Sequence, residues 1–73
     1  MEKLLKLLHS LYPEIDFSKE KHLMTDRILD SAAVVSIISE IEDEFGVSVS
    51  MEYIQPQYFE SAETMWEMIE ELS

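Results

Sequence analysis

Ser31 is the residue of this sequence with the widest choice of chemistry. It follows Leu29 and Asp30 at the end of a polar stretch, and it opens the longest apolar run in the chain. A serine at such a junction can cap a helix, act as a nucleophile or carry a covalently attached group. The remaining residues decide which of these roles is available.

Nucleophilic catalysis by Ser31 is not expected, because a serine nucleophile needs a base within hydrogen-bond reach. The only histidines are His9, in an expected helix, and His22, in an expected loop. The only glycine is Gly46, so no Gly-x-Ser-x-Gly motif is present. We therefore predict that the protein is not an enzyme.

A specific metal site is not expected either. The acidic run from Glu40 to Glu44 falls in an expected helix, so its carboxylates fan around the helix and do not converge. No segment has the ligand order and central glycine of an EF-hand loop. The chain has no cysteine, which excludes disulfides and thiolate ligands. The core is predicted to include four methionines, namely Met24, Met51, Met65 and Met68.

The charge of the chain is unevenly distributed. The 73 residues are predicted to form one domain, residues 1–73. Every Lys and Arg lies within residues 1–27, which are neutral overall, so the net charge of −11 falls on residues 28–73. Such a surface repels phosphate backbones, which argues against nucleic-acid binding, and it favours partners with basic patches.

The apolar residues are too dispersed for a membrane protein. No run approaches the roughly 20 apolar residues that a membrane span needs. Charged residues interrupt the leucine-rich start of the chain, which differs in this respect from a signal peptide. We expect the mature protein to begin at Met1 and to be a soluble, cytoplasmic monomer that does not insert into membranes.

Helical periodicity predicts an all-α fold. A first helix is expected over residues 2–12, ended by Pro13. A long loop over residues 13–30 follows, held to the core by scattered apolar residues. The side chains expected to hold it are Ile15, Phe17, Leu23, Ile28 and Leu29.

The second helix is expected over residues 31–45, capped by Asp30 or Ser31 and ended by Gly46. Its predicted apolar stripe consists of Val34, Ile38, Ile41 and Phe45, widened by Val35 and Ile37. The alternating residues 47–51 are expected to form an extended loop, because a single strand would have no partner.

A short helix is predicted over residues 56–60, with Tyr58 and Phe59 turned inward, and a last helix over residues 62–72, capped by Ser61. The predicted buried stripe of the last helix consists of Ala62, Met65, Trp66, Ile69 and Leu72. The expected fold is a small bundle of three main helices and one short helix, with a long loop between the first two helices.

Two blocks of residues resemble a known family, the acyl carrier proteins and related carrier domains. The blocks are Leu23-x-x-Asp26-x-x-Leu29-Asp30-Ser31 and, downstream, Val35, Ile38, Ile41 and Glu42-Asp43-Glu44-Phe45-Gly46-Val47. The resemblance covers essentially the whole chain and implies an acyl-carrier-like bundle. It also implies that Ser31 carries covalent 4′-phosphopantetheine, taken from coenzyme A, and that Asp30 supports the attachment motif.

The resemblance implies partners as well. They would be a phosphopantetheinyl transferase, an adenylating acyl or aminoacyl ligase, and an acyltransferase with basic docking patches. The residues expected to meet them are Ala32, Ser36, Glu40, Glu42, Asp43 and Glu44.

At some positions this chain has residues that differ from those usual in fatty-acid carriers. Ala32 stands where those carriers usually have a large aliphatic residue, and Ala33 and Ser36 stand where they usually have acids. The segment from Phe45 to Ser61 is similar in length and pattern to that of D-alanyl carrier proteins. Two alternatives remain: a fatty-acid or polyketide synthase carrier, and an unmodified acidic interaction module in which Ser31 only caps a helix.

Overall fold

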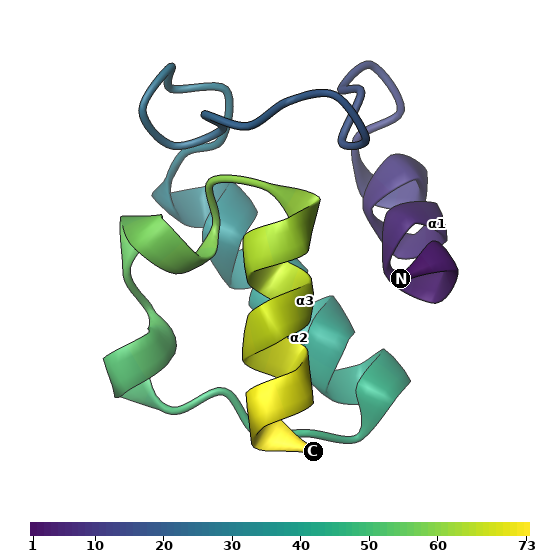
Figure 1. Ribbon diagram of the computed structural model, residues 1–73, viewed down its shortest axis with the longest axis vertical. Helices are drawn as coiled ribbons and strands as arrows, with labels where there is room; N and C mark the ends of the chain where they lie inside the picture. The colour runs from purple at the N-terminus through teal and green to yellow at the C-terminus, as the bar shows by residue number, and fades with distance from the viewer.

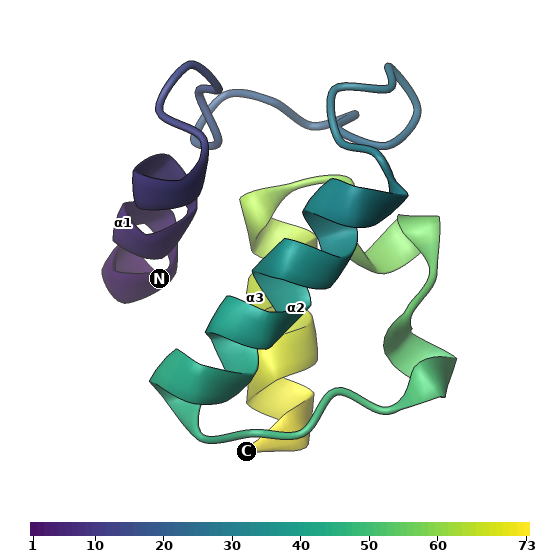
Figure 2. The same ribbon diagram turned by 180° about the vertical axis from the view of Figure 1, so that it is seen from behind.

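The computed structural model describes residues 1–73 and is helical throughout, without strands (Figures 1 and 2). The elements in chain order are α1 (Glu2–Leu11), α2 (Ser31–Phe45), η1 (Met51–Tyr53), η2 (Pro56–Tyr58) and α3 (Ala62–Leu72), where η denotes a short 3₁₀ helix. The predicted all-α bundle is therefore confirmed. None of the helices combines the length and apolar content that a membrane crossing requires.

The three α-helices share one hydrophobic core. α1 packs against both α2 and α3, and η2 packs against α3. The loop between α1 and α2 crosses one end of the bundle, above the start of α3 in the view of Figure 1. Buried residues of that loop, Phe17, Leu23 and Leu29, join the core, so the loop is ordered by packing despite its irregular backbone.

The helix ends lie close to where local chemistry predicts them. α1 ends at Leu11, one residue earlier than expected, before Pro13. α2 ends at Gly46, whose φ of 63° is the left-handed conformation that glycine adopts without steric cost. α3 begins with a capping box in which the side chains of Ser61 and Thr64 each accept the backbone N–H of the other.

The prediction that Val35 widens the apolar stripe of α2 is wrong, since Val35 is 63% exposed. Each helical residue turns by about 100°, so Val34 and Val35 face different directions. Ala33 and Ile37 are buried together with Val34. The buried arc of α2 therefore extends to the side of Ala33 and Ile37, which leaves Val35 on the outer side.

The remaining corrections concern the edge of the core. Met65 and Met68 are fully buried as predicted and Met24 packs against the core, but Met51 is 86% exposed. Ile28 is also exposed, whereas Leu29 beside it is buried. Trp66 and Leu72 are only partly buried, at the margin of the core.

The segment between α2 and α3 contains two 3₁₀ turns instead of one short α-helix. Residues 47–50 form a loop without regular secondary structure, but Met51, expected to belong to this loop, begins the unpredicted turn η1 (Met51–Tyr53). The predicted helix over residues 56–60 is the shorter turn η2, and Phe59 after it is fully buried. Tyr58 packs edge-on against Tyr53, with ring centroids 5.2 Å apart, and this contact joins the two turns.

Candidate functional site

Ser31 is the first residue of α2, and it is exposed. Of the two candidate caps, Asp30 is the one used: its side-chain Oδ1 accepts the backbone N–H of Ala33 at 2.8 Å. The hydroxyl of Ser31 makes no hydrogen bond within the protein, so the fold does not require it. The backbone N–H groups of Ser31 and Ala32 belong to the first turn, where a helix offers no carbonyl acceptor.

This arrangement fits a phosphate ester on Ser31. The side chain projects from the positive end of the α2 dipole, which stabilises a nearby negative charge. A hydroxyl that is exposed and unpaired is also accessible to a modifying enzyme. The role that the structure itself gives to Asp30 is the capping of α2.

The loop that leads to Ser31 is held by Glu60, a residue that sequence reasoning missed. The Glu60 carboxylate accepts the backbone N–H of Met24 at 2.8 Å and that of Thr25 at 2.9 Å, and it also accepts the hydroxyl of Thr25. The backbone carbonyl of Glu60 accepts the N–H of Leu23 at 2.9 Å. Hydrogen bonds from the Thr25 side chain and backbone lower the pKa of the Glu60 carboxyl.

The same loop closes on itself just before Ser31. The carbonyl of Leu23 accepts the backbone N–H groups of both Ile28 and Leu29, at 2.9 and 3.0 Å. Arg27, within the closed turn, has a φ of 57°, a left-handed conformation that favours glycine. Leu23 and Leu29 are both buried, so the turn has a fixed place on the core.

The residues predicted to bind partners divide into two groups. Ala32, Ser36, Glu40 and Asp43 are all exposed, and their spacing of 4, 4 and 3 residues places them on one stripe of α2. We call these four residues the α2 stripe.

Glu42 and Glu44 instead have partners within the protein. The carboxylate of Glu42 accepts the backbone N–H of Val49 at 2.8 Å, which ties the end of α2 to the following segment. Glu44 lies 3.7 Å from the ammonium of Lys3, which also lies 5.2 Å from the centre of the Phe45 ring. Glu42 therefore contributes to the fold, whereas the Lys3–Glu44 pair is exposed to solvent and contributes little.

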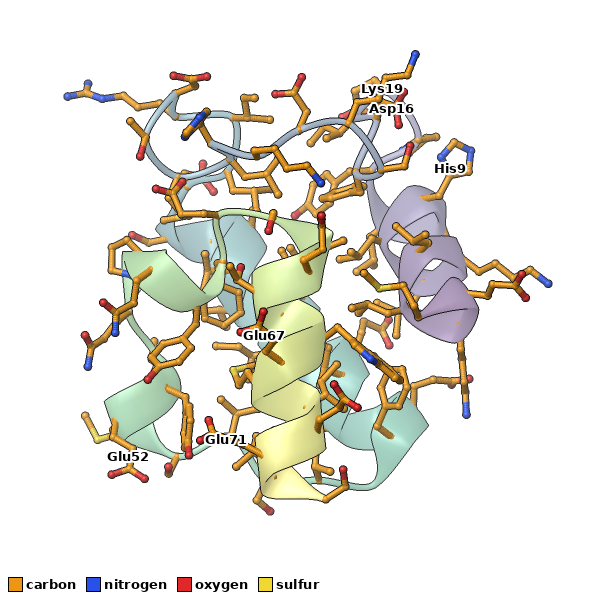
Figure 3. All side chains as sticks on the ribbon, in the orientation of Figure 1. His9, Asp16, Lys19, Glu52, Glu67 and Glu71 are labelled. Atoms are coloured by element: carbon orange, nitrogen blue, oxygen red, sulfur yellow. The ribbon has the colours of Figure 1, made fainter.

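Charged residues lie at both ends of the molecule. His9 and Lys19 lie at one end of the molecule, beside the long loop, whereas Glu52 and Glu71 lie at the other (Figure 3). Glu71 raises the pKa of the Tyr53 hydroxyl, because the nearby negative charge disfavours phenolate. The neutral N-terminal part of the chain and its acidic remainder also meet, because Lys3 pairs with Glu44 and Lys21 pairs with Glu63.

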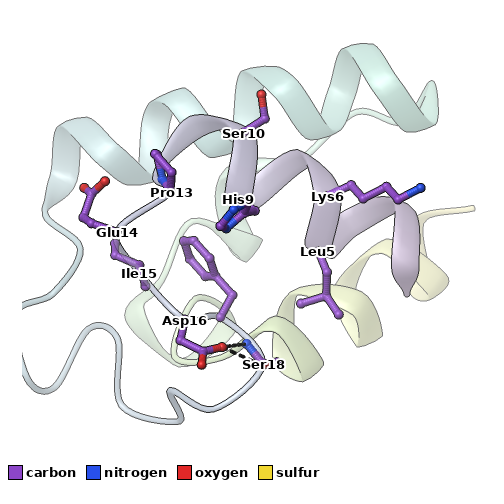
Figure 4. A pocket seen from close by; sticks show the side chains of 10 residues that line it. Leu5, Lys6, His9, Ser10, Pro13, Glu14, Ile15, Asp16 and Ser18 are labelled. Carbon is purple, nitrogen blue, oxygen red and sulfur yellow. Dashed lines mark hydrogen bonds between the residues drawn. The ribbon is translucent and has the colours of Figure 1, made fainter.

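His9 belongs to a groove of its own. This groove is formed by α1 and the following loop, and Pro13, Ile15 and Phe17 contribute to its lining (Figure 4). Asp16 at its edge accepts hydrogen bonds from the backbone N–H of Ser18 at 3.2 Å and from the Ser18 hydroxyl at 2.6 Å. Ser31 is not among the residues of this groove, so His9 and Ser31 lie in separate sites.

No family model, curated protein or solved structure matches this chain.

Proposed function

We propose that the protein is a carrier of acyl or aminoacyl groups, held as thioesters on 4′-phosphopantetheine attached to Ser31. The observation that carries the proposal is the exposed, unpaired hydroxyl of Ser31 at the start of α2, beside an Asp30 that caps the helix by itself. The resemblance of the surrounding motif to acyl carrier proteins supplies the chemical identity of the group.

Attachment would form a bond between Ser31 Oγ and the phosphorus atom on the pantetheine side of the coenzyme A diphosphate, and the P–O bond from that phosphorus to the nucleotide part would break. The hydroxyl proton leaves to a base of the transferase, and the nucleotide part departs as the leaving group. The attached arm would supply a thiol, which this cysteine-free chain does not otherwise have. An adenylating ligase would load the thiol, and an acyltransferase would remove the cargo. Because these reactions consume coenzyme A and activated nucleotides, the location we propose is the cytoplasm.

Among carriers, the surroundings of Ser31 favour the D-alanyl carrier type. Ala32 is exposed beside Ser31 and offers a partner only a methyl group, whereas fatty-acid carriers usually present a large aliphatic residue there. The cargo we propose is therefore an amino acid such as D-alanine, or another small carboxylic acid.

The test is the intact mass of the protein after incubation with coenzyme A and a broad-specificity phosphopantetheinyl transferase. We expect a gain of about 340 Da, the mass of the arm. Ser31→Ala should abolish the gain. Ser36→Ala is the matched control, because Ser36 is an exposed serine of the same helix, and it should leave the gain intact. An unchanged mass with several active transferases would leave the protein as an unmodified interaction module.

A further inference from the structure

A small pocket opens beside Ser31. Its volume is about 190 Å³, and it lies between the start of α2 and the segment from Ile54 to Phe59, which passes that end of the helix (Figure 2). Ser31, Val34 and Val35 form the α2 side of the pocket. Their spacing of three and four residues places the two valines one turn below the serine.

The remaining wall is almost entirely apolar. Met24 of the long loop and Ile54 and Pro56 of the facing segment line it, together with the fully buried Phe59. Gln55 is the only polar lining residue besides Ser31, and its side-chain Nε2 already donates to the backbone carbonyl of Glu52 at 2.9 Å. The pocket therefore suits an aliphatic group.

Apolar side chains at the rim of the pocket are exposed to solvent and are not buried in the core. Val35 is 63% exposed and Ile54 is 44% exposed, although both are large aliphatic residues. Removing such surface from water is favourable in proportion to its area. An aliphatic group held in the pocket would cover part of both side chains.

We propose that this pocket binds the branched aliphatic part of the arm attached to Ser31. This inference rests on the proposed function. In 4′-phosphopantetheine a carbon bearing two methyl groups lies one CH₂ beyond the phosphate ester, so this group is tethered close to the pocket. The phosphate stays in water, and the dimethyl group meets Val35 and Ile54.

The size of the pocket limits what it holds. A water molecule occupies about 30 Å³ of the liquid, so the pocket takes roughly six groups of that size. Pockets for complete small-molecule ligands are larger, at about 300–1,000 Å³. The pocket thus accommodates the dimethyl end of the arm but leaves the thiol and its cargo outside, accessible to partner enzymes.

The test compares methyl NMR spectra of the unmodified protein, the protein carrying the arm, and the protein with acetyl or octanoyl groups on the arm. Intact mass first establishes that the arm is present. We expect attachment to shift the methyl signals of Val34, Val35 and Ile54, and we expect no further shift as the acyl group lengthens. The methyls of Ile69, a buried residue of α3 that does not line the pocket, serve as the internal reference.

A pair of variants tests the same contact by stability. The arm should raise the melting temperature of the wild type, and Ile54→Ser should remove that increment. Met51→Ser is the control, because Met51 is exposed in the same segment but does not line the pocket. A mass gain without methyl shifts, or shifts that grow with acyl length, would overturn the inference while leaving the proposed function in place. The absence of a mass gain would overturn both.

Discussion

The hydrogen bonding of the Asp30 and Ser31 side chains predicts different effects on stability for substitutions of these two neighbouring residues. Asp30→Ala removes the cap of α2, which costs about 0.5–2 kcal/mol in known cases. The first turn of α2 has no acidic residue of its own, so the favourable interaction of Asp30 with the helix dipole, about 0.3–1 kcal/mol, is lost as well. We expect the free energy of unfolding to fall by about 1–2 kcal/mol.

Ser31→Ala should change the free energy of unfolding by less than about 0.5 kcal/mol, because the substitution breaks no hydrogen bond and alanine is a good helix former. It should nevertheless abolish modification by the transferase. Asp30→Asn is an intermediate control, since its side-chain oxygen still caps the helix but carries no charge.

Urea denaturation measures these effects. Trp66 is the only tryptophan and contacts the Phe45 ring edge-on, with centroids 5.9 Å apart, so its fluorescence reports on the packing of α2 against α3. In a domain of this size, 1 kcal/mol corresponds to roughly 4–8 °C in melting temperature. If Ser31→Ala destabilises the protein as much as Asp30→Ala does, then Ser31 caps the helix and the reasoning is refuted.

Three further predictions concern the carboxylates. The pKa of the Glu60 carboxyl is lowered in the folded state. Its contribution to stability is therefore present above the unfolded pKa of about 4.3 and is lost as the pH falls through the folded pKa. The urea midpoint should accordingly fall less between pH 7 and acid in Glu60→Gln than in the wild type. Glu42→Ala should lower the free energy of unfolding by about 1 kcal/mol, because the Val49 N–H loses its acceptor. Asp43→Ala is the control and should change the free energy of unfolding by less than about 0.5 kcal/mol. Equal losses in the two variants would contradict the role assigned to Glu42. Glu40→Lys combined with Asp43→Lys should slow association with the transferase and weaken its salt dependence in stopped-flow measurements. An unchanged association rate in low salt would show that these acids are only solvated.

Local signals in the sequence were sufficient to predict the helices. Asp30 and Ser61 have short side chains that accept backbone N–H groups, and they stand immediately before the two longest helices. Pro13 and Gly46 stand just after the ends of α1 and α2, for reasons of backbone geometry alone. Each of these signals acts within one turn of the chain, so no knowledge of the fold is needed to interpret it.

The contacts that position the site could not be predicted in this way. Glu60 and Thr25 are 35 residues apart, and their hydrogen bond depends on how the long loop crosses the start of α3. Glu42 lies in an acidic run that looks uniform in the sequence. Only the turn of the chain after Gly46, which brings the Val49 N–H within 2.8 Å of Glu42, distinguishes Glu42 from the exposed Asp43.

The exposure of Val35 has a similar explanation. On an isolated helix, the position of Val35 is compatible with a wider apolar stripe. The side to which the buried face of α2 extends depends on where α1 and α3 lie in the fold. Val35 therefore changes from a predicted core residue to a residue at the rim of the pocket beside Ser31. The direction in which the buried arc of α2 extends thus explains both the wrong prediction for Val35 and the apolar surface at the pocket.

The position of Ser31 one residue after the cap matters because the domain is small. A chain of about 70 residues buries only about 60% of its unfolded surface and has little stability in reserve. If Ser31 were the cap, one oxygen atom would have to accept the backbone N–H and also form the phosphate ester, and a bridging ester oxygen is a weaker acceptor than a carboxylate. With Asp30 as the cap, the proposed attachment to Ser31 would leave the capping hydrogen bond of α2 in place. In the pair Asp30-Ser31 the capping group is thus distinct from the proposed attachment site, and the hydrogen bonds of Glu60 hold the loop before this pair.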